Sequence, residues 1–161
     1  MSEILSLNSN NAPAISSREV GEIGEELAAR FLLKKGYRPI VANFKVPIGR
    51  NIRGVAVTGE IDLIAFDENV LCFIEVKTRS SDEFASPLAA IDLRKQRQII
   101  RAAKAYRQIF HLSGINFRYD AVSIILRKNA RPEIEILKTS GLKPNFRKNR
   151  GQANSGEFFR T

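Results

Sequence analysis

The sequence predicts an α/β fold in which helices flank a mixed β-sheet. Apolar residues recur at helical spacing in two segments, one near the N-terminus and one in the middle of the chain. Three apolar strands lie between those segments, and two more follow the second helix. This order is typical of a layered α/β domain with the sheet inside. Because 161 residues suffice for one hydrophobic core, a single domain is expected.

The ends of both helices carry recognisable signals. The first helix is expected to begin at Ser16 or Ser17 and to end before Gly36. The second is expected to begin after Asp92, a candidate N-cap. Their predicted apolar stripes are Val20, Ile23, Leu27, Phe31 and Leu32 in the first, and Ile99, Ile100, Ala103, Tyr106 and Phe110 in the second. The predicted strands cover residues 37–43, 59–66, 70–78, 117–126 and 134–137.

Three further segments lack sustained hydrophobic periodicity. Residues 1–17 are predicted to be a disordered N-terminal tail, and residues 143–161 a flexible basic C-terminal tail. The domain between them covers residues 18–142. Within it, residues 45–58 contain two glycines and two arginines, a composition that predicts a mobile arm.

Composition argues against several classes of protein. No apolar run approaches the ~20 residues that span a bilayer, and the N-terminus lacks the basic start and apolar core of a signal peptide. We therefore expect a cytoplasmic protein with no membrane partner. The single cysteine, Cys72, lies in an apolar strand and is expected in the core. With His111 as the one histidine, a zinc site is not expected.

Two of the predicted strands carry charge where apolar residues are expected. Asp62 lies in the first of them, and Glu75 and Lys77 lie in the second. Burying a carboxylate among apolar neighbours is costly unless a cation compensates it. Because oxygen ligands suit Mg²⁺ or Mn²⁺, we expect Asp62, Glu75 and the Val76 carbonyl to bind the metal. Lys77 would place its charge beside the attacking water or the scissile phosphate. The alternative is an exposed strand with a surface ion pair.

The separation of Asp62 from Glu75 depends on the loop that joins their strands. A four-residue loop, residues 67–70, pairs Phe66 with Leu71 and sets Asp62 directly opposite Glu75, within about 5 Å. A two-residue loop keeps both carboxylates on one face with a diagonal offset, whereas a three-residue loop puts them on opposite faces. The sequence leaves these alternatives open.

The pattern of Asp62, a hairpin and then Glu75-x-Lys77 resembles the PD-(D/E)xK nuclease core of type II restriction enzymes and archaeal Holliday-junction resolvases. More narrowly, the chain from about residue 18 to about residue 137 is similar to the YraN family of functionally uncharacterised bacterial proteins. The matching segments are residues 21–28, 35–37, 59–64, 74–79, 86–88, 94–97 and 118–120. One departure is that the link between Asn43 and Gly59 is longer here than is usual in the family.

This resemblance implies a restriction-endonuclease-like fold with further catalytic residues. Glu25, on the first helix, would reach the metal directly or through water. Gln96 would place a polar group near the scissile phosphate. With Asp62, Glu75 and Lys77 they form the predicted catalytic set. The alternative for Glu25 is an ordinary surface glutamate, since two more glutamates lie nearby in the same helix.

Positive charge dominates the second helix. The chain has a net charge of +9, and the helix contains no acidic residue after Asp92. Solvated helices usually mix signs, so a face of one sign indicates a polyanionic partner that is bound through its backbone. The alternative is a basic face that only keeps the protein in solution. The residues expected to contact nucleic acid are Arg79, Arg94, Lys95, Arg97, Arg101 and Lys104.

These observations together predict a Mg²⁺-dependent endonuclease that acts on nucleic acid, with DNA as the expected partner. Branched DNA is implied by the resemblance to resolvases. One alternative is a nucleic-acid-binding module that keeps the fold without cleaving, and another is a protein-interaction scaffold. The sequence leaves open whether the substrate is branched, duplex or single-stranded DNA or RNA. It also leaves open whether two copies form a homodimer to cut two strands.

Overall fold

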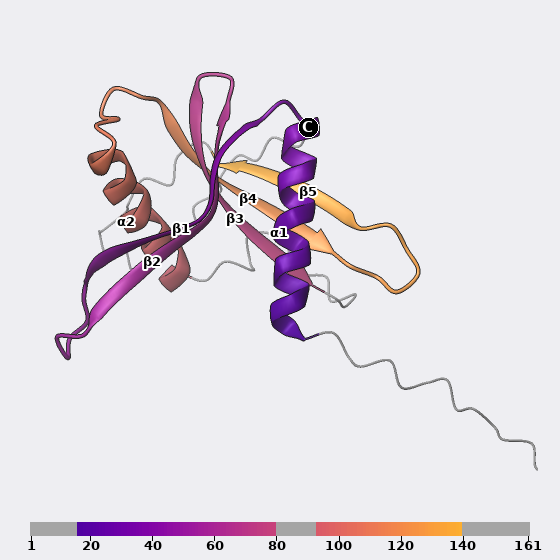
Figure 1. Cartoon of the computed structure of the whole chain (residues 1–161), viewed down its shortest axis with the longest axis horizontal. Helices are drawn as coiled ribbons and strands as arrows, with labels where there is room; N and C mark the ends of the chain where they lie inside the picture. Colours follow the sequence, from indigo (N-terminus) through magenta and orange to yellow (C-terminus); the bar gives the residue numbers. More distant parts are fainter. Residues whose placement is uncertain (1–15, 80–92, 140–161) are drawn as a thin grey trace, which may run out of the picture.

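The computed structural model describes residues 16–79 and 93–139, so Asp92, the segment at 86–88 and nearly all of both predicted tails lie outside the described residues. Helices and strands follow the predicted order (Figure 1). They are α1 (Ser17–Lys34), β1 (Arg38–Arg50), β2 (Ala56–Asp67), β3 (Val70–Arg79), α2 (Leu93–Ile109), β4 (Phe117–Ile125) and β5 (Glu133–Thr139).

The strands form one mixed sheet in the order β1-β2-β3-β4-β5. β3 and β4 run parallel because the chain between them crosses over through α2, whereas all other neighbours are antiparallel. The predicted α/β fold with a mixed sheet between helices is therefore confirmed, and it is compatible with a restriction-endonuclease-like fold. No helix within the described ranges is long and apolar enough to cross a membrane.

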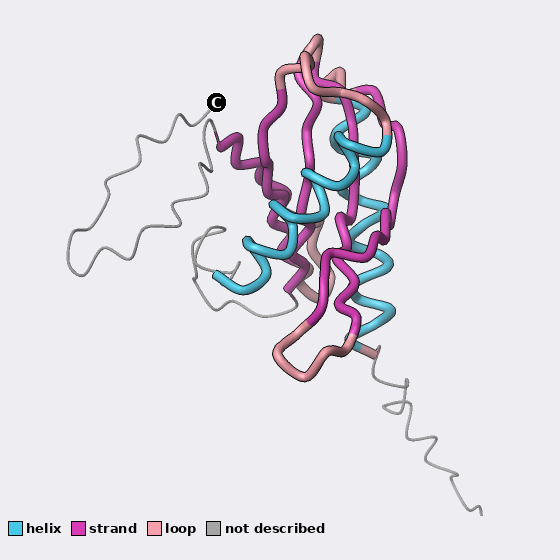
Figure 2. Tube along the Cα trace, turned by 90° about the vertical axis from the view of Figure 1, so that its left-hand side faces the viewer, coloured by secondary structure: helices cyan, strands magenta, loops and turns pink. Residues whose placement is uncertain are grey.

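Each face of the sheet carries its own hydrophobic core. On one face, Ile99 and Tyr106 of α2 pack with Phe73 of β3. On the other, Leu32 of α1 packs in a cluster that contains Cys72, so the expected core position of this cysteine is confirmed. Figure 2 shows the two helices on different sides of the strands. Two layers of helix therefore enclose the sheet.

Local sequence signals determine both ends of α1. Ser16 is the N-cap and forms a capping box with Glu19. The Glu19 N–H donates to the Ser16 hydroxyl at 3.2 Å, and the Ser16 N–H donates to the Glu19 carboxylate at 2.7 Å. The helix ends at Lys34, and Gly36 follows with a φ of 89°, which glycine adopts without strain.

Gly24 sets the distance between α1 and β3. A β-carbon at this position would lie 1.7 Å from Thr78 Oγ1. The buried residues of α1 are therefore Gly24, Ala28 and Leu32, whereas Ile23, a member of the predicted stripe, is 40% exposed. The point of closest approach requires a small residue, and hydrophobic periodicity alone does not reveal where that point lies.

The hairpin of β1 and β2 is longer than the sequence predicted. The first strand was expected to end at residue 43, but β1 continues to Arg50, which pairs with Ala56 of β2. The mobility expected of residues 45–58 stays a prediction. The register shifts next to Pro39 and again next to Pro47, and proline has no N–H to donate to the ladder. These irregularities hide the alternation that would otherwise identify a long strand in the sequence.

We expect Gly24→Ala to lower the free energy of unfolding by about 1–3 kcal/mol, because the added methyl must push α1 away from Thr78. Gly21→Ala is the matched control, since nothing lies within 4 Å of its β-carbon position. Alanine there should stabilise the helix by up to about 1 kcal/mol. Urea unfolding followed by circular dichroism measures both, and equal changes in the two variants would contradict the close contact.

Candidate metal centre

The hairpin of β2 and β3 aligns the two predicted carboxylates. Phe66 pairs with Leu71, which is the pairing expected for a loop of residues 67–70. The paired residues end at Leu63 and Ile74, so Asp62 and Glu75 are the next residues along the two strands. The side chains of these two acidic residues, which are thirteen positions apart in the sequence, interact with each other.

The turn of the β2–β3 hairpin is shorter than the expected four-residue loop of residues 67–70. Asp67 pairs with Val70, so Glu68 and Asn69 alone form the turn, and Glu68 has a φ of 52°. A two-residue turn was expected to offset the carboxylates diagonally, but the pairs from Asp67 to Leu63 follow the register that was expected for the longer loop. The pair of Asp67 and Val70 is one more than the four-residue loop would allow, and it leaves the register of all the other pairs unchanged.

β2 separates from β3 beyond Leu63, and Asp62 lies at the opening. The ladder between these strands ends at Leu63, and the N–H of Val76 donates to Asp62 Oδ2 at 2.7 Å. Ile61 and Ile64 both pack in the core on the α2 side, although regular alternation along a strand would place Ile61 on the face of Leu63. The alternation of faces is therefore interrupted at Asp62, where the strand turns away from its neighbour.

Glu75 is buried with an incomplete set of partners. Glu75 is 8% exposed, and its Oε1 lies 3.0 Å from Nζ of Lys95, which is in the first turn of α2. Oε2 is buried and has no hydrogen-bonding partner among the described residues. An unpaired carboxylate oxygen in such surroundings is unfavourable. A bound cation would satisfy it.

Burial and mutual repulsion raise the pKa of both carboxyl groups. For Glu75, burial and then the charge of Asp62 raise the pKa to about 7, although Lys95 opposes them. For Asp62, burial raises the pKa, although the Val76 N–H and Lys95 favour the ionised form. Burial disfavours the charged form of Lys95, but the two carboxylates outweigh it and raise the pKa of the ammonium. The metal-free site thus resists holding two negative charges.

The ammonium that pairs with Glu75 belongs to Lys95 and not to Lys77. Lys77 is exposed, two positions after Glu75 in β3. Lys95 was expected among the phosphate contacts, but it precedes the buried Ile99 by four residues and so shares the inward side of α2. That spacing is the sequence signal that would have placed Lys95 in the site. A contact between Lys77 and a phosphate stays a prediction.

Glu25 and Gln96, the remaining predicted catalytic residues, are both half-buried. Glu25 follows Gly24, where α1 meets Thr78 near the end of β3. Within residues 16–79 and 93–139, no three Asp, Glu, His or Cys side chains form a group able to hold a metal ion. The roles of Glu25 and Gln96, like that of the Val76 carbonyl, stay predictions.

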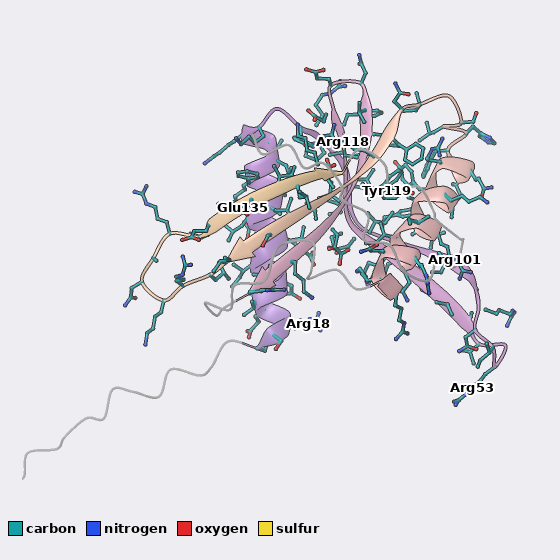
Figure 3. All side chains as sticks on the ribbon, turned by 180° about the vertical axis from the view of Figure 1, so that it is seen from behind. Arg18, Arg53, Arg101, Arg118, Tyr119 and Glu135 are labelled. Atoms are coloured by element: carbon teal, nitrogen blue, oxygen red, sulfur yellow. The ribbon has the colours of Figure 1, made fainter. Side chains whose placement is uncertain are left out.

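α2 presents a line of basic residues to solvent. Its exposed cations are Arg94, Arg97, Arg101 and Lys104 (Arg101 is labelled in Figure 3). We call these four exposed residues of α2 the basic face of α2. Arg79, at the end of β3, is half-buried. Their contact with nucleic acid stays a prediction.

Sequence reasoning missed a second set of charged side chains, which lies near the β2–β3 turn. Arg118 Nε donates to both oxygens of Asp120 at 2.9 Å, and Arg118 also contacts Asp67 Oδ2 at 2.5 Å. Lys138 Nζ lies 3.0 Å from the same Asp67 oxygen. The Arg118 guanidinium donates to the Tyr37 hydroxyl at 2.8 Å. We call these five residues the Arg118 cluster.

The Arg118 cluster needs no ligand. Burial raises the pKa of Asp120, and Arg118 opposes that shift through its hydrogen bonds and charge. The chain supplies two cations for two carboxylates, so the cluster is formally neutral. Segment 118–120, which the resemblance singled out, is thus explained by packing. The sequence signal that could have found this cluster is the same as for Asp62, namely charged residues within an apolar strand.

In metal-free buffer, we expect the free energy of unfolding to fall as pH rises from about 5 to 8. The folded state keeps a proton on Glu75 up to a pKa of about 7, above the ordinary value of 4.5. The stability that this protonation contributes is present in full below the ordinary pKa and is lost as pH rises through the folded pKa, by about 3 kcal/mol in total. Urea unfolding with EDTA across this range measures it. Glu75→Gln should flatten the profile and exposed Glu26→Gln should not; equal profiles for all three proteins would contradict the shift.

Comparison with known proteins identifies relatives of this chain. A model of "Uncharacterised protein family UPF0102" matches residues 24–124. A UPF0102 protein of Caldanaerobacter subterraneus subsp. tengcongensis is 38% identical over 112 residues, which cover 70% of this chain and 84% of the relative. A UPF0102 protein of Solibacter usitatus is 41% identical over 118 residues, or 73% of this chain and 82% of the relative. The one from Desulfosudis oleivorans is 35% identical over 123 residues, or 76% and 89%.

The matched segment spans both carboxylates and the lysine of the site. Asp62, Glu75 and Lys95 all fall within residues 24–124, and the relatives are covered over most of their length. The resemblance to the YraN family is thereby confirmed. The chain belongs to the uncharacterised protein family UPF0102.

Proposed function

We propose that this protein is a Mg²⁺- or Mn²⁺-dependent nuclease that hydrolyses phosphodiester bonds of nucleic acid, with DNA as the expected substrate. The observation that carries the proposal is the buried Oε2 of Glu75, which lacks a partner among the described residues and lies beside a second buried carboxylate, Asp62. Branched DNA is one candidate substrate, because the sequence resembles that of resolvases.

The chemistry of the donor set fits a hard divalent cation. Asp62 and Glu75 offer carboxylate oxygens, and Val76 between Glu75 and Lys77 offers a backbone carbonyl. With both carboxylates ionised, two negative charges face the single ammonium of Lys95, which leaves a net charge of −1. A divalent cation would offset that excess, whereas the neutral Arg118 cluster offers no comparable place.

The chain's own residues would position the substrate and stabilise charge. When bound, the metal supplies an activated water and a polarised phosphate. Asp62 is already oriented for binding by the N–H of Val76. In this proposal Lys77 stabilises the negative charge that develops on the phosphate, Glu25 assists at the metal, and Gln96 orients the phosphate.

Lys95 would compete with the metal for Glu75. Its ammonium lies 3.0 Å from Oε1, where it neutralises one of the two carboxylates, and its side chain is 32% exposed. Because the side chain reaches solvent, the ammonium can turn outward when a cation takes its place. It would then lie next to the basic face of α2, where a phosphate backbone is expected.

The alternative is a nucleic-acid-binding module that does not cleave. The ion pair of Lys95 with Glu75 favours this alternative, because it already satisfies one carboxylate oxygen without a metal. The basic face of α2 serves either function. A cleavage assay decides between them: labelled branched, duplex and single-stranded DNA and RNA are incubated with Mg²⁺, Mn²⁺ or EDTA. We expect metal-dependent products from the parent protein, and their absence from every substrate would leave the binding module.

Substitutions in the site should separate metal binding from chemistry. Calorimetry is expected to show Mg²⁺ or Mn²⁺ binding that Asp62→Asn or Glu75→Gln weakens at least tenfold, because a charged ligand is removed. Without metal, either variant should melt at the same or a higher temperature, because repulsion is relieved. Lys77→Ala should keep its metal affinity but lose cleavage. Lys95→Met should bind the metal more tightly, because the competing ammonium is gone.

A structural ion pair predicts the reverse pattern. Asp62→Asn, Glu75→Gln and Lys95→Met would then all melt at lower temperature, with no dependence on added metal. That outcome, together with no detectable cation binding by the parent protein, would remove the nuclease proposal. The exposed Lys77→Ala serves as the stability control in the same series.

Binding should be electrostatic and largely independent of base sequence. Replacing Arg97, Arg101 and Lys104 by Ala is expected to flatten the plot of log affinity against log salt by about 0.9 for each phosphate of duplex DNA that the variant no longer binds. Fluorescence anisotropy at several salt concentrations measures this slope. The matched control removes three exposed charges from α1 instead, at Arg18, Arg30 and Lys34. An equal reduction in both triple variants would show that net charge, and not the basic face of α2, controls binding.

A further inference from the structure

The hairpin of β1 and β2 ends in an apolar tip that extends past the body of the molecule. Both strands continue beyond the end of the β2–β3 ladder, and residues 51–55 join them (Figure 1). Ile52 is fully exposed at this tip, and Val55 is 59% exposed. Figure 3 shows Arg53 at the far end of the same hairpin.

The conformation of the tip is determined by its own hydrogen bonds. The backbone N–H of Asn51 donates to the Val55 carbonyl at 2.9 Å, and that of Gly54 donates to the Asn51 carbonyl at 2.9 Å. The Asn51 side-chain oxygen accepts from the N–H groups of Arg53 and Val55, at 2.9 and 3.0 Å. The Arg50 guanidinium donates to the Gly54 carbonyl at 2.7 Å. The exposed isoleucine therefore lies in a turn that is closed by hydrogen bonds.

Positive charge surrounds this apolar tip. Residues 38–59 contain four basic residues and no acidic one. Lys45, at the base of the hairpin, pairs with Glu60, whereas Arg50 and Arg53 lie at the tip. Single exposed isoleucines are common on protein surfaces. An exposed isoleucine held in a closed turn between two arginines is more specific, because it combines an apolar wedge with cations that bind phosphate.

We propose that the tip is a wedge for duplex nucleic acid, in which Ile52 inserts between stacked base pairs while Arg53 binds a neighbouring phosphate. Proteins that kink a duplex commonly insert an apolar side chain between base steps and hold the backbone with basic residues. This inference rests on the proposed function, since it assumes that nucleic acid is the substrate. It adds a second contact region, which lies outside the candidate metal centre.

The length of the hairpin sets where the wedge would act. Asp62 lies six positions after Ala56, the first residue after the turn, which is about 20 Å of extended strand. Base pairs are spaced by about 3.4 Å along a duplex. On a duplex that runs along the hairpin, the wedge would enter the stack at least about six base pairs from the phosphate at the metal centre. Gly59 packs against Ile48 and Ala102 between these points, so the hairpin rests on α2.

The test measures base unstacking without cleavage. A short DNA duplex carries aminopurine, a fluorescent adenine analogue that brightens when it leaves the base stack, and is mixed with the protein in EDTA. We expect the parent protein to raise the fluorescence and Ile52→Ala to return it to the level of free duplex. Leu33→Ala, which truncates an exposed apolar residue on α1, is the matched control and should behave as the parent. Arg53→Ala should keep the fluorescence rise at saturation and reduce the salt slope by about 0.9.

The outcomes separate this inference from the proposed function. Unstacking that depends on Ile52, with no cleavage by any metal-loaded sample, would support the wedge and overturn the nuclease proposal. Metal-dependent cleavage with the same fluorescence for the parent and Ile52→Ala would overturn the wedge alone. A parent protein that sediments as a dimer, and becomes monomeric in Ile52→Ala without any change in unstacking, would also overturn the wedge and make the tip a contact between copies.

Discussion

The hydrogen bond from the Val76 N–H to Asp62 Oδ2 is the contact on which the rest of the candidate site depends. In a continuous antiparallel ladder a backbone carbonyl of the neighbouring strand would be the usual acceptor for such a group. Here a side chain accepts, so β2 leaves β3 after Leu63 while the N–H stays paired. The same separation buries Asp62 beside Glu75 and lets β2 continue with β1 as a long hairpin. One contact between a side chain and the backbone therefore links the site to the hairpin.

Two groups of buried charge in this fold show how a site differs from a structural network. In the Arg118 cluster, Arg118 and Lys138 face Asp67 and Asp120, and the charges cancel. In the candidate metal centre, Lys95 faces both Asp62 and Glu75, and a buried oxygen is left over. Burial raises the pKa of carboxyl groups in both places. The candidate metal centre therefore differs from the Arg118 cluster in having more acidic than basic groups, and not in being buried. This excess of negative charge is what a bound cation would neutralise.

α2 connects the parts of the molecule that the proposals use. Its inward side supplies Lys95 to Glu75 and packs on the sheet through Ile99. Its basic face is exposed, and its middle supports the hairpin, where Ala102 lies so close to Gly59 that a β-carbon there would be 3.0 Å away. The metal centre, the basic face and the hairpin are thus held by one helix. Because each uses different side chains, single substitutions can test their functions separately.

Local features were enough to predict the order of elements, the capped ends of α1 and the carboxylates Asp62 and Glu75, because periodicity, capping and charge within a strand are all properties of neighbouring residues. The register of the β2–β3 hairpin also follows from the sequence once the turn is known, because the pair next to the turn determines every later pair of the ladder. Helical spacing indicates that Lys95 lies on the inward side of α2, and charge within an apolar strand indicates Asp120. The tertiary structure decided which groups they pair with, as it decided the strand separation at Asp62 and the pairing of residues 45–58. Each of these depends on which distant segments approach closely, as Gly24 does at Thr78. Such distances are set by the packing of whole elements, which no local pattern encodes.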